Sequence, residues 1–120
     1  MGTMITAQET KQRMISDPRW WKIALMDFVD DFRYNHDPAA ISQPFELDDI
    51  ERDAVLAGVI ETLCDEMQIQ IPEWLYDVPA SPKPVFLSRM ENLKSFSIAE
   101  SPARLRLRKV FVGDNFLFRV

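Results

Sequence analysis

The stretch Pro18–Tyr34, PRWWKIALMDFVDDFRY, carries the clearest structural signal in the chain. Asp17 stands in front of it, so that a capping residue precedes a proline at the first helical position. The large apolar residues are spaced like one face of a helix, at Trp21, Leu25, Phe28 and Phe32. We therefore predict an amphipathic helix over Pro18–Tyr34, which ends before Pro38 because proline interrupts helix hydrogen bonding.

A shorter helix is predicted on the N-terminal side of this stretch. Thr6 is followed three residues later by Glu9, which is the spacing of a capping box. The sequence after Thr6 is amphipathic, and we predict a helix over Ala7–Ser16.

A second long amphipathic helix is predicted on the C-terminal side, over Asp48–Gln68, with Asp48 or Asp49 as its cap. Gly58 in the middle of it disfavours the helix and indicates a close crossing with another helix. Three carboxylates are expected to face water, at Glu61, Asp65 and Glu66. The expected buried face is broad and comprises Ile50, Ala54, Ala57, Ile60, Leu63, Cys64 and Met67.

The remaining chain is predicted to contain shorter elements. Prolines make 77–87 a connecting segment that wraps the helical body, and short helices are expected over 90–100 and Ala103–Arg108. The tail either pairs Val110–Val112 with Phe116–Val120 as a β-hairpin or forms a last helical turn. The predicted fold class is mainly α: a compact helical domain with two long amphipathic helices, a Pro-rich wrapping segment and a short C-terminal helix.

Length and composition fit one globular domain over residues 1–120. Of the 120 residues, 47% are hydrophobic and 28% charged. Residues 1–5 are expected to be disordered or a cloning remnant. A single cysteine, Cys64, excludes a disulfide within the chain and fits a reducing, cytoplasmic location. No apolar run approaches the roughly 20 residues that span a bilayer, so no membrane partner is expected.

Charge is distributed unevenly along the chain. Residues 1–82 hold 6 Lys and Arg against 16 Asp and Glu, a net charge of −10, whereas residues 83–120 hold 8 against 3, a net charge of +5. Two interpretations follow. The basic end pairs with the protein's own acidic body, or it leaves a basic patch exposed for a partner.

The basic end is the candidate binding site. Arginines in it can bind carboxylates or phosphates in a bidentate manner, and aromatic residues follow closely. The candidate partner-binding residues are Arg104, Arg106, Arg108, Lys109, Phe111, Phe116 and Phe118.

Signals for catalysis are weak. Asp27 and Asp31 share a helix face near His36 and form a candidate divalent-metal site, but a solvated acidic face is the favoured interpretation. Cys64 lies in an apolar helical row and is interpreted as a core residue. No phosphate loop, dinucleotide glycine pattern or metal-binding motif is present. We therefore expect no enzymatic activity, no cofactor and no metal.

Parts of the chain resemble small uncharacterised bacterial proteins, some of which are the antitoxin-like member of putative toxin–antitoxin pairs. The matching stretches are PVF at Pro84–Phe86, AESPA at Ala99–Ala103, RLR at Arg104–Arg106, VFV at Val110–Val112 and WKIALMDFVDDFR at Trp21–Arg33. Other carriers have a helix-turn-helix upstream, from which this chain departs. The resemblance implies a partner-binding role beside a nucleotidyltransferase-like toxin and identifies no active site.

Two functions are therefore expected. The first is a non-enzymatic protein-interaction module, antitoxin-like, that docks a partner enzyme through the basic and aromatic C-terminal segment. The alternative is a nucleic-acid-binding regulatory protein that uses the same basic segment, which the acidic body disfavours.

Overall fold

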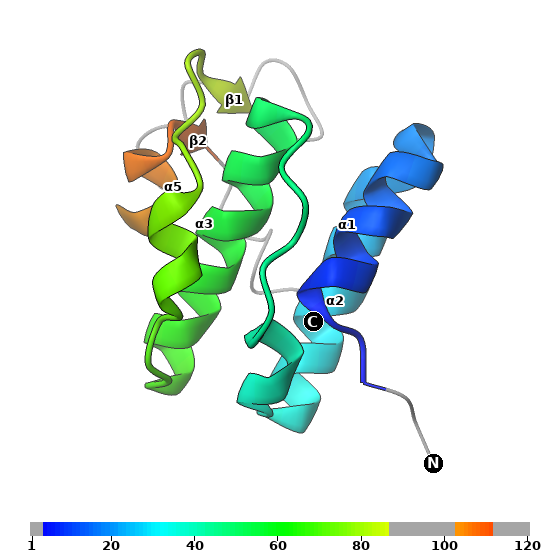
Figure 1. Ribbon diagram of the computed structural model, residues 1–120, viewed down its shortest axis with the longest axis vertical. Coiled ribbons are helices and arrows are strands. Elements are labelled where there is room, and N and C mark those ends of the chain that lie inside the picture. The colour runs from blue at the N-terminus through cyan, green and yellow to red at the C-terminus, as the bar shows by residue number, and fades with distance from the viewer. Residues whose placement is uncertain (1–3, 87–102, 112–120) are drawn as a thin grey trace.

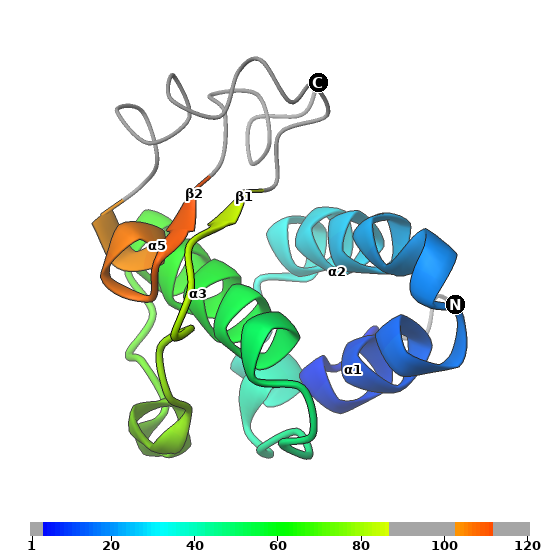
Figure 2. The same ribbon diagram turned by 90° about the horizontal axis from the view of Figure 1, so that it is seen from above.

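The computed structural model describes residues 4–86 and 103–111, apart from the side chains of Pro18, Phe86 and Phe111. The described chain is mainly helical, as predicted. Its long helices are α1 (Ala7–Ser16), α2 (Trp21–Asn35) and α3 (Ile50–Met67), and a short helix α5 (Ala103–Leu107) follows later. α1 and α2 lie side by side, and α3 lies between this pair and α5 (Figures 1 and 2).

The N-terminal helix begins and ends where the sequence predicts. The hydroxyl of Thr6 accepts the backbone N–H of Glu9 at 3.1 Å, which satisfies one of the free donors of the first turn of α1. Met4 and Ile5 in front of it pack against the core, and the N–H of Ile5 donates to Asp31 at 2.8 Å. Met4 and Ile5, which fall in the stretch expected to be disordered or a cloning remnant, are therefore part of the packed chain, and residues 1–3 lie outside the described chain.

The second helix matches its prediction except at its start. A 3₁₀ turn, η1 (Pro18–Trp20), precedes α2, and the side chain of Asp17 makes no capping hydrogen bond there. Leu25, Phe28 and Phe32 are buried as predicted, with the last two rings stacked 5.8 Å apart. The helix ends at Asn35, and the next residue, His36, has a left-handed φ of 54° that turns the chain away.

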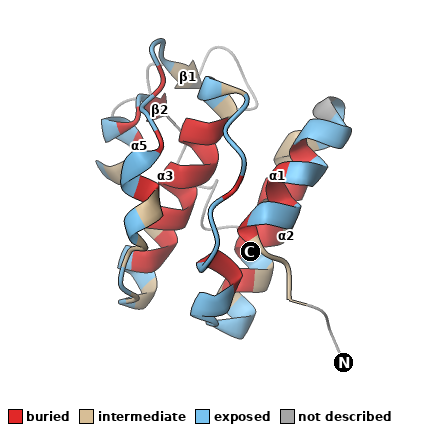
Figure 3. Ribbon diagram, in the orientation of Figure 1, coloured by how far each residue is buried: buried red, intermediate tan, exposed pale blue. Residues whose placement is uncertain are grey.

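The third helix is more deeply buried than one amphipathic face allows. Asp49 caps it by accepting the N–H groups of Glu51 and Arg52. Every residue from 53 to 61 is buried, because neighbours cover α3 on several sides (Figure 3). Two predictions are corrected by this packing: Glu61 is buried instead of facing water, and Ile50 is exposed instead of buried.

The connections between these helices run close to the core. After the 3₁₀ turn η2 (Pro38–Ile41), Phe45 is buried and packs edge-on against Trp74, with ring centroids 5.4 Å apart. Leu47, two residues further along the chain, is exposed. Pro72 directly precedes the short turn η3 (Glu73–Asp77) as its N-cap residue.

The Pro-rich segment lies along the end of α5. The N–H of Ser81 donates to the carbonyl of Arg108 at 3.1 Å, and β1 (Val85–Phe86) pairs in parallel with β2 (Val110–Phe111). The sequence did not indicate this pairing, because strands of two residues carry no periodicity. The predicted hairpin partner Phe116–Val120, the alternative helical turn and the predicted helix over 90–100 lie outside the described residues.

No helix in the described ranges is long and apolar enough to cross a membrane.

Gly58 allows α5 to cross α3 closely, as predicted. A Cβ atom at this position would lie 2.6 Å from Cδ2 of Leu105 and 3.4 Å from Cδ of Arg108. A side chain larger than hydrogen would therefore force the buried side chain of Leu105 to shift.

Gly58→Ala is expected to destabilise the fold by about 1–3 kcal/mol through overpacking, although alanine is the better helix former. In a Leu105→Ala background the same change is expected to stabilise by up to about 1 kcal/mol, because the new methyl group then has room. Urea unfolding of the wild type, both single variants and the double variant measures this reversal. If Gly58→Ala changes the unfolding free energy with the same sign in both backgrounds, the close crossing is contradicted.

Candidate functional site

The basic C-terminal segment is held to the body by Arg108. Its guanidinium donates from Nε to Glu61 Oε1 at 2.6 Å, from Nη1 to the carbonyl of Val78 at 2.7 Å, and from Nη2 to the carbonyl of Leu75 at 2.9 Å. The arginine is 8% exposed, and Glu61 is also buried. One side chain at the end of α5 therefore contacts α3, η3 and Val78 directly after η3, and its contacts are internal rather than available to a partner.

A second cation of the segment also pairs within the protein. Arg104 donates from Nε to Asp65 Oδ2 at 2.8 Å and from Nη2 to Asp65 Oδ1 at 3.3 Å. Both side chains are partly exposed, and the hydrogen bond raises the pKa of Arg104. The interpretation that the basic end pairs with the acidic body is confirmed for Arg104 and Arg108.

The other two cations point away from the body. Arg106 and Lys109 are exposed and form no ion pair with any residue in the described ranges. Leu107 lies between them and is 75% exposed. The face of α5 that carries Leu105 and Arg108 is occupied by α3, so the next residues around the helix face outward. We call Arg106, Leu107 and Lys109 the basic surface.

The side chain of Phe111, and all of Phe116 and Phe118, lie outside the described part of the chain. Their role in partner binding stays a prediction. Leu107 is an exposed apolar residue of the segment that the sequence had not singled out.

A buried ion cluster at the other end of the molecule was missed by the sequence analysis. Lys11 of α1 is fully buried, and its Nζ lies 2.6 Å from Asp48 Oδ1, contacts Asp53 Oδ1 and donates to the carbonyl of Glu46 at 2.7 Å. The ammonium also lies 5.3 Å from the ring centroid of Phe45. The signal was available in the periodicity, since Lys11 follows Ala7 by four residues and precedes Met14 by three on the buried face.

The two carboxylates of this cluster titrate differently. Burial raises the pKa of Asp53, and the bond to Lys11 only partly offsets that effect. The same lysine lowers the pKa of Asp48, which lies closer to solvent. The cluster ties α1 to the start of α3 and the loop before it, and its buried members, Lys11 and Asp53, face inward.

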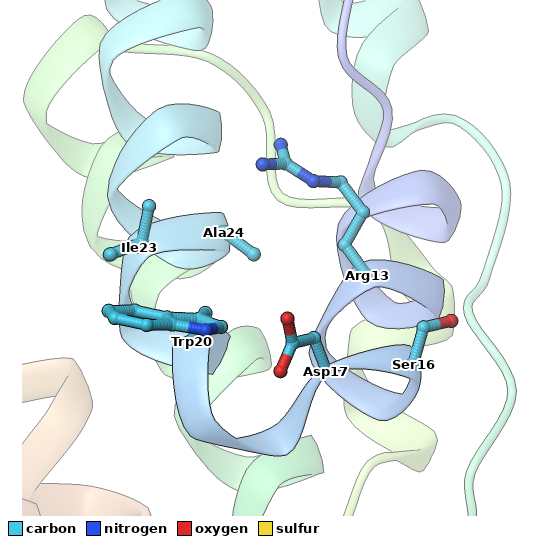
Figure 4. A pocket seen from close by; sticks show the side chains of 6 residues that line it. All are labelled: Arg13, Ser16, Asp17, Trp20, Ile23 and Ala24. Carbon is cyan, nitrogen blue, oxygen red and sulfur yellow. The ribbon is translucent and has the colours of Figure 1, made fainter.

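A small cleft lies between α1 and α2. It has a volume of about 210 Å³ and is lined by Arg13, Ser16, Asp17, Trp20, Ile23 and Ala24 (Figure 4). Typical pockets for small-molecule ligands occupy about 300–1,000 Å³. The cleft is therefore a weaker candidate site than the basic surface.

The carboxylates suggested as metal ligands are engaged elsewhere. Asp27 pairs with Arg13 at 2.9 Å, and Asp31 accepts the N–H of Ile5. His36 is exposed at the end of α2. Among the described residues there is no group of three or more potential metal ligands.

Cys64 has the environment of a core residue. It is buried, and burial raises the pKa of its thiol to about 11. The thiolate is the nucleophilic form of cysteine, so this side chain is poorly suited to attack a substrate at neutral pH.

The geometry thus defines a mainly helical protein with an anchored basic surface. Comparison with known proteins adds no relative, since no family model, no curated protein and no solved structure matches the chain.

Proposed function

We propose that this chain is a non-enzymatic protein-interaction module, antitoxin-like, that binds a partner enzyme in the bacterial cytoplasm through its basic C-terminal segment. The observation that carries the proposal is the basic surface itself. Arg106, Leu107 and Lys109 are exposed on an element that Arg108 and Leu105 hold firmly against α3. Binding residues on an anchored element lose little conformational freedom when a partner docks.

The chemistry of the surface indicates the kind of partner face it accepts. Two cations on either side of an exposed leucine suit an apolar patch that carries carboxylates. The resemblance to antitoxin-like proteins supports a neighbouring enzyme of the nucleotidyltransferase type as that partner. We propose Phe111, Phe116 and Phe118 as further partner-contacting residues.

Nucleic-acid binding receives less support from the same geometry. Two of the four cations in Arg104–Lys109 are neutralised by Asp65 and Glu61, which leaves Arg106 and Lys109 to contact phosphates. Each neutralised phosphate contributes about −0.9 to the slope of log K against log salt concentration. Two phosphate contacts therefore provide only weak affinity.

The test is binding of the purified chain to the product of the adjacent gene, measured by calorimetry. Arg106→Glu with Lys109→Glu is expected to weaken binding by about tenfold or more, because two favourable charges become repulsive. The matched control is Arg19→Glu with Lys83→Glu, which changes two exposed cations elsewhere and alters the net charge equally. The proposal fails if no binding is seen, or if the control weakens it as much.

A further inference from the structure

A partner for the basic surface needs an exposed apolar centre surrounded by unpaired carboxylates. The chain carries such a surface itself, where the loop after η2 enters α3. Leu47 is 48% exposed and Ile50 is 46% exposed. Glu46 and Glu51, which flank them, are exposed and form no ion pair with the residues that the structure describes. We call Glu46, Leu47, Ile50 and Glu51 the acidic surface.

The backbone of the acidic surface, like that of the basic one, is held by buried contacts. Lys11 binds the carbonyl of Glu46 and the carboxylate of Asp48, and Phe45 is buried directly before them. The side chain of Asp49 caps α3 at the point where Ile50 begins it. The exposed leucine and isoleucine therefore stand on rigid backbone, and their exposure does not come from a loosely held loop.

The two surfaces do not cover each other within one molecule. α5 lies on one side of α3, and the loop that leads into α3 lies on the other side, toward α1 (Figures 1 and 2). Leu107 on one surface and Leu47 on the other are both largely exposed in the same structure. Any contact between the two surfaces must therefore join separate molecules.

We infer that the chain associates with a second copy of itself, the basic surface of one copy docking on the acidic surface of the other. The signs of charge are complementary, and each surface places exposed apolar side chains between its charges. Each surface alone repels its own copy, so the contact pairs two different patches. This inference goes beyond the proposed function and needs no partner enzyme.

Salt distinguishes this association from a purely apolar one. At 0.01 M salt the Debye length is about 30 Å, and at 1 M it is about 3 Å. Sedimentation equilibrium at low salt is expected to give a mass that rises with protein concentration above the 14.0 kDa monomer. At high salt the mass is expected to fall toward the monomer value. A mass that stays monomeric at low salt and millimolar protein overturns the inference.

Charge reversal provides the specific test. Arg106→Glu with Lys109→Glu reverses the basic surface, and Glu46→Lys with Glu51→Lys reverses the acidic surface. Each variant alone then carries two surfaces of like sign, so its self-association constant is expected to fall by about tenfold or more. An equimolar mixture of the two variants is expected to associate again, because unlike surfaces are restored between them.

The mixture also distinguishes a reversed surface from a misfolded variant. A variant that had merely lost its fold could not regain association on mixing, and far-UV circular dichroism of each variant checks this directly. If both variants are folded and the mixture stays monomeric, the assigned surfaces are wrong. Binding of the adjacent gene product is scored separately, so loss of one interaction leaves the other interpretable.

Discussion

Arg108→Met is expected to reduce the free energy of unfolding by about 3–5 kcal/mol, the cost of removing one partner from a buried ion pair. The substitution leaves the carboxylate of Glu61 buried without its cation and removes the donors that serve the carbonyls of Leu75 and Val78. Urea unfolding followed by circular dichroism measures the loss.

Arg104→Met is the matched control, because it removes a guanidinium from α5, four residues before Arg108. Its pair with Asp65 is partly exposed, at 39% and 50% of the two side chains, and an exposed pair contributes at most about 1 kcal/mol. Equal losses of unfolding free energy in Arg104→Met and Arg108→Met would show that burial does not decide how much each arginine contributes to stability.

A double variant tests whether the loss of stability in Arg108→Met comes from the unpaired carboxylate of Glu61. Adding Glu61→Leu to Arg108→Met removes the unpaired carboxylate and is expected to recover part of the lost stability. Recovery is incomplete, because the carbonyls of Leu75 and Val78 still lack their donor. An additive double variant would contradict direct coupling between the two side chains.

Lys11→Met is expected to be the other strongly destabilising change, at about 3–5 kcal/mol near neutral pH. Methionine fills a volume similar to that of the lysine stem but leaves Asp53 buried without a cation. The double variant Lys11→Met with Asp53→Leu is expected to recover most of the loss, because the buried charges are then removed together. Chemical unfolding of the three chains measures both effects.

The loss caused by Lys11→Met should depend on pH in a definite direction. The pKa of Asp53 is already raised in the fold by burial, and removing the lysine raises it further. As pH falls through that raised pKa, the native state of the variant takes up a proton before the unfolded state does, so its stability rises relative to the wild type.

The lowered pKa of Asp48 also reduces the difference in stability between wild type and variant on acidification. Lys11 lowers the pKa of Asp48, so this contribution is present at neutral pH and is lost as pH falls through the lowered pKa. The raised pKa of Asp53 should therefore make the difference between wild type and variant shrink from pH 7 toward about pH 4, the ordinary range of a carboxyl group, and the lowered pKa of Asp48 should make it shrink further below that range. A difference that grows on acidification would contradict the role given to Lys11.

Self-association would affect how the basic surface meets any other partner. A second copy and a partner enzyme would compete for Arg106, Leu107 and Lys109, since one surface cannot hold both at once. Partner binding should then weaken as the chain concentration rises at low salt, which calorimetry at two protein concentrations can measure.

The helices were predictable because their signals are local. Thr6 and Glu9 mark the start of α1, and the spacing of Leu25, Phe28 and Phe32 identifies the buried face of α2. Gly58 indicated a close helix crossing, because a residue of low helix propensity in the middle of a helix needs a compensating contact. Caps, periodicity and mid-helix glycines depend on residues within a few positions of one another.

The candidate site was predictable only in part. The charge asymmetry indicated that the basic end meets the acidic body, and Arg104 and Arg108 do so. The sequence does not indicate which cations stay exposed, because Arg104, Arg106 and Arg108 have equivalent surroundings in it. The division between Arg108 and Arg106 depends on the direction from which α3 approaches α5.

By itself, the sequence determined the mainly helical class, the positions of α1, α2 and α3, and the basic character of the C-terminal segment. Only the tertiary structure decided that Lys11 and Glu61 are buried ions, that Ile50 is exposed, and that Val85–Phe86 pairs with Val110–Phe111. The physical reason is distance along the chain. A buried charge is tolerated only where a partner far away in the sequence arrives to satisfy it, as Asp53 does for Lys11 and Arg108 does for Glu61.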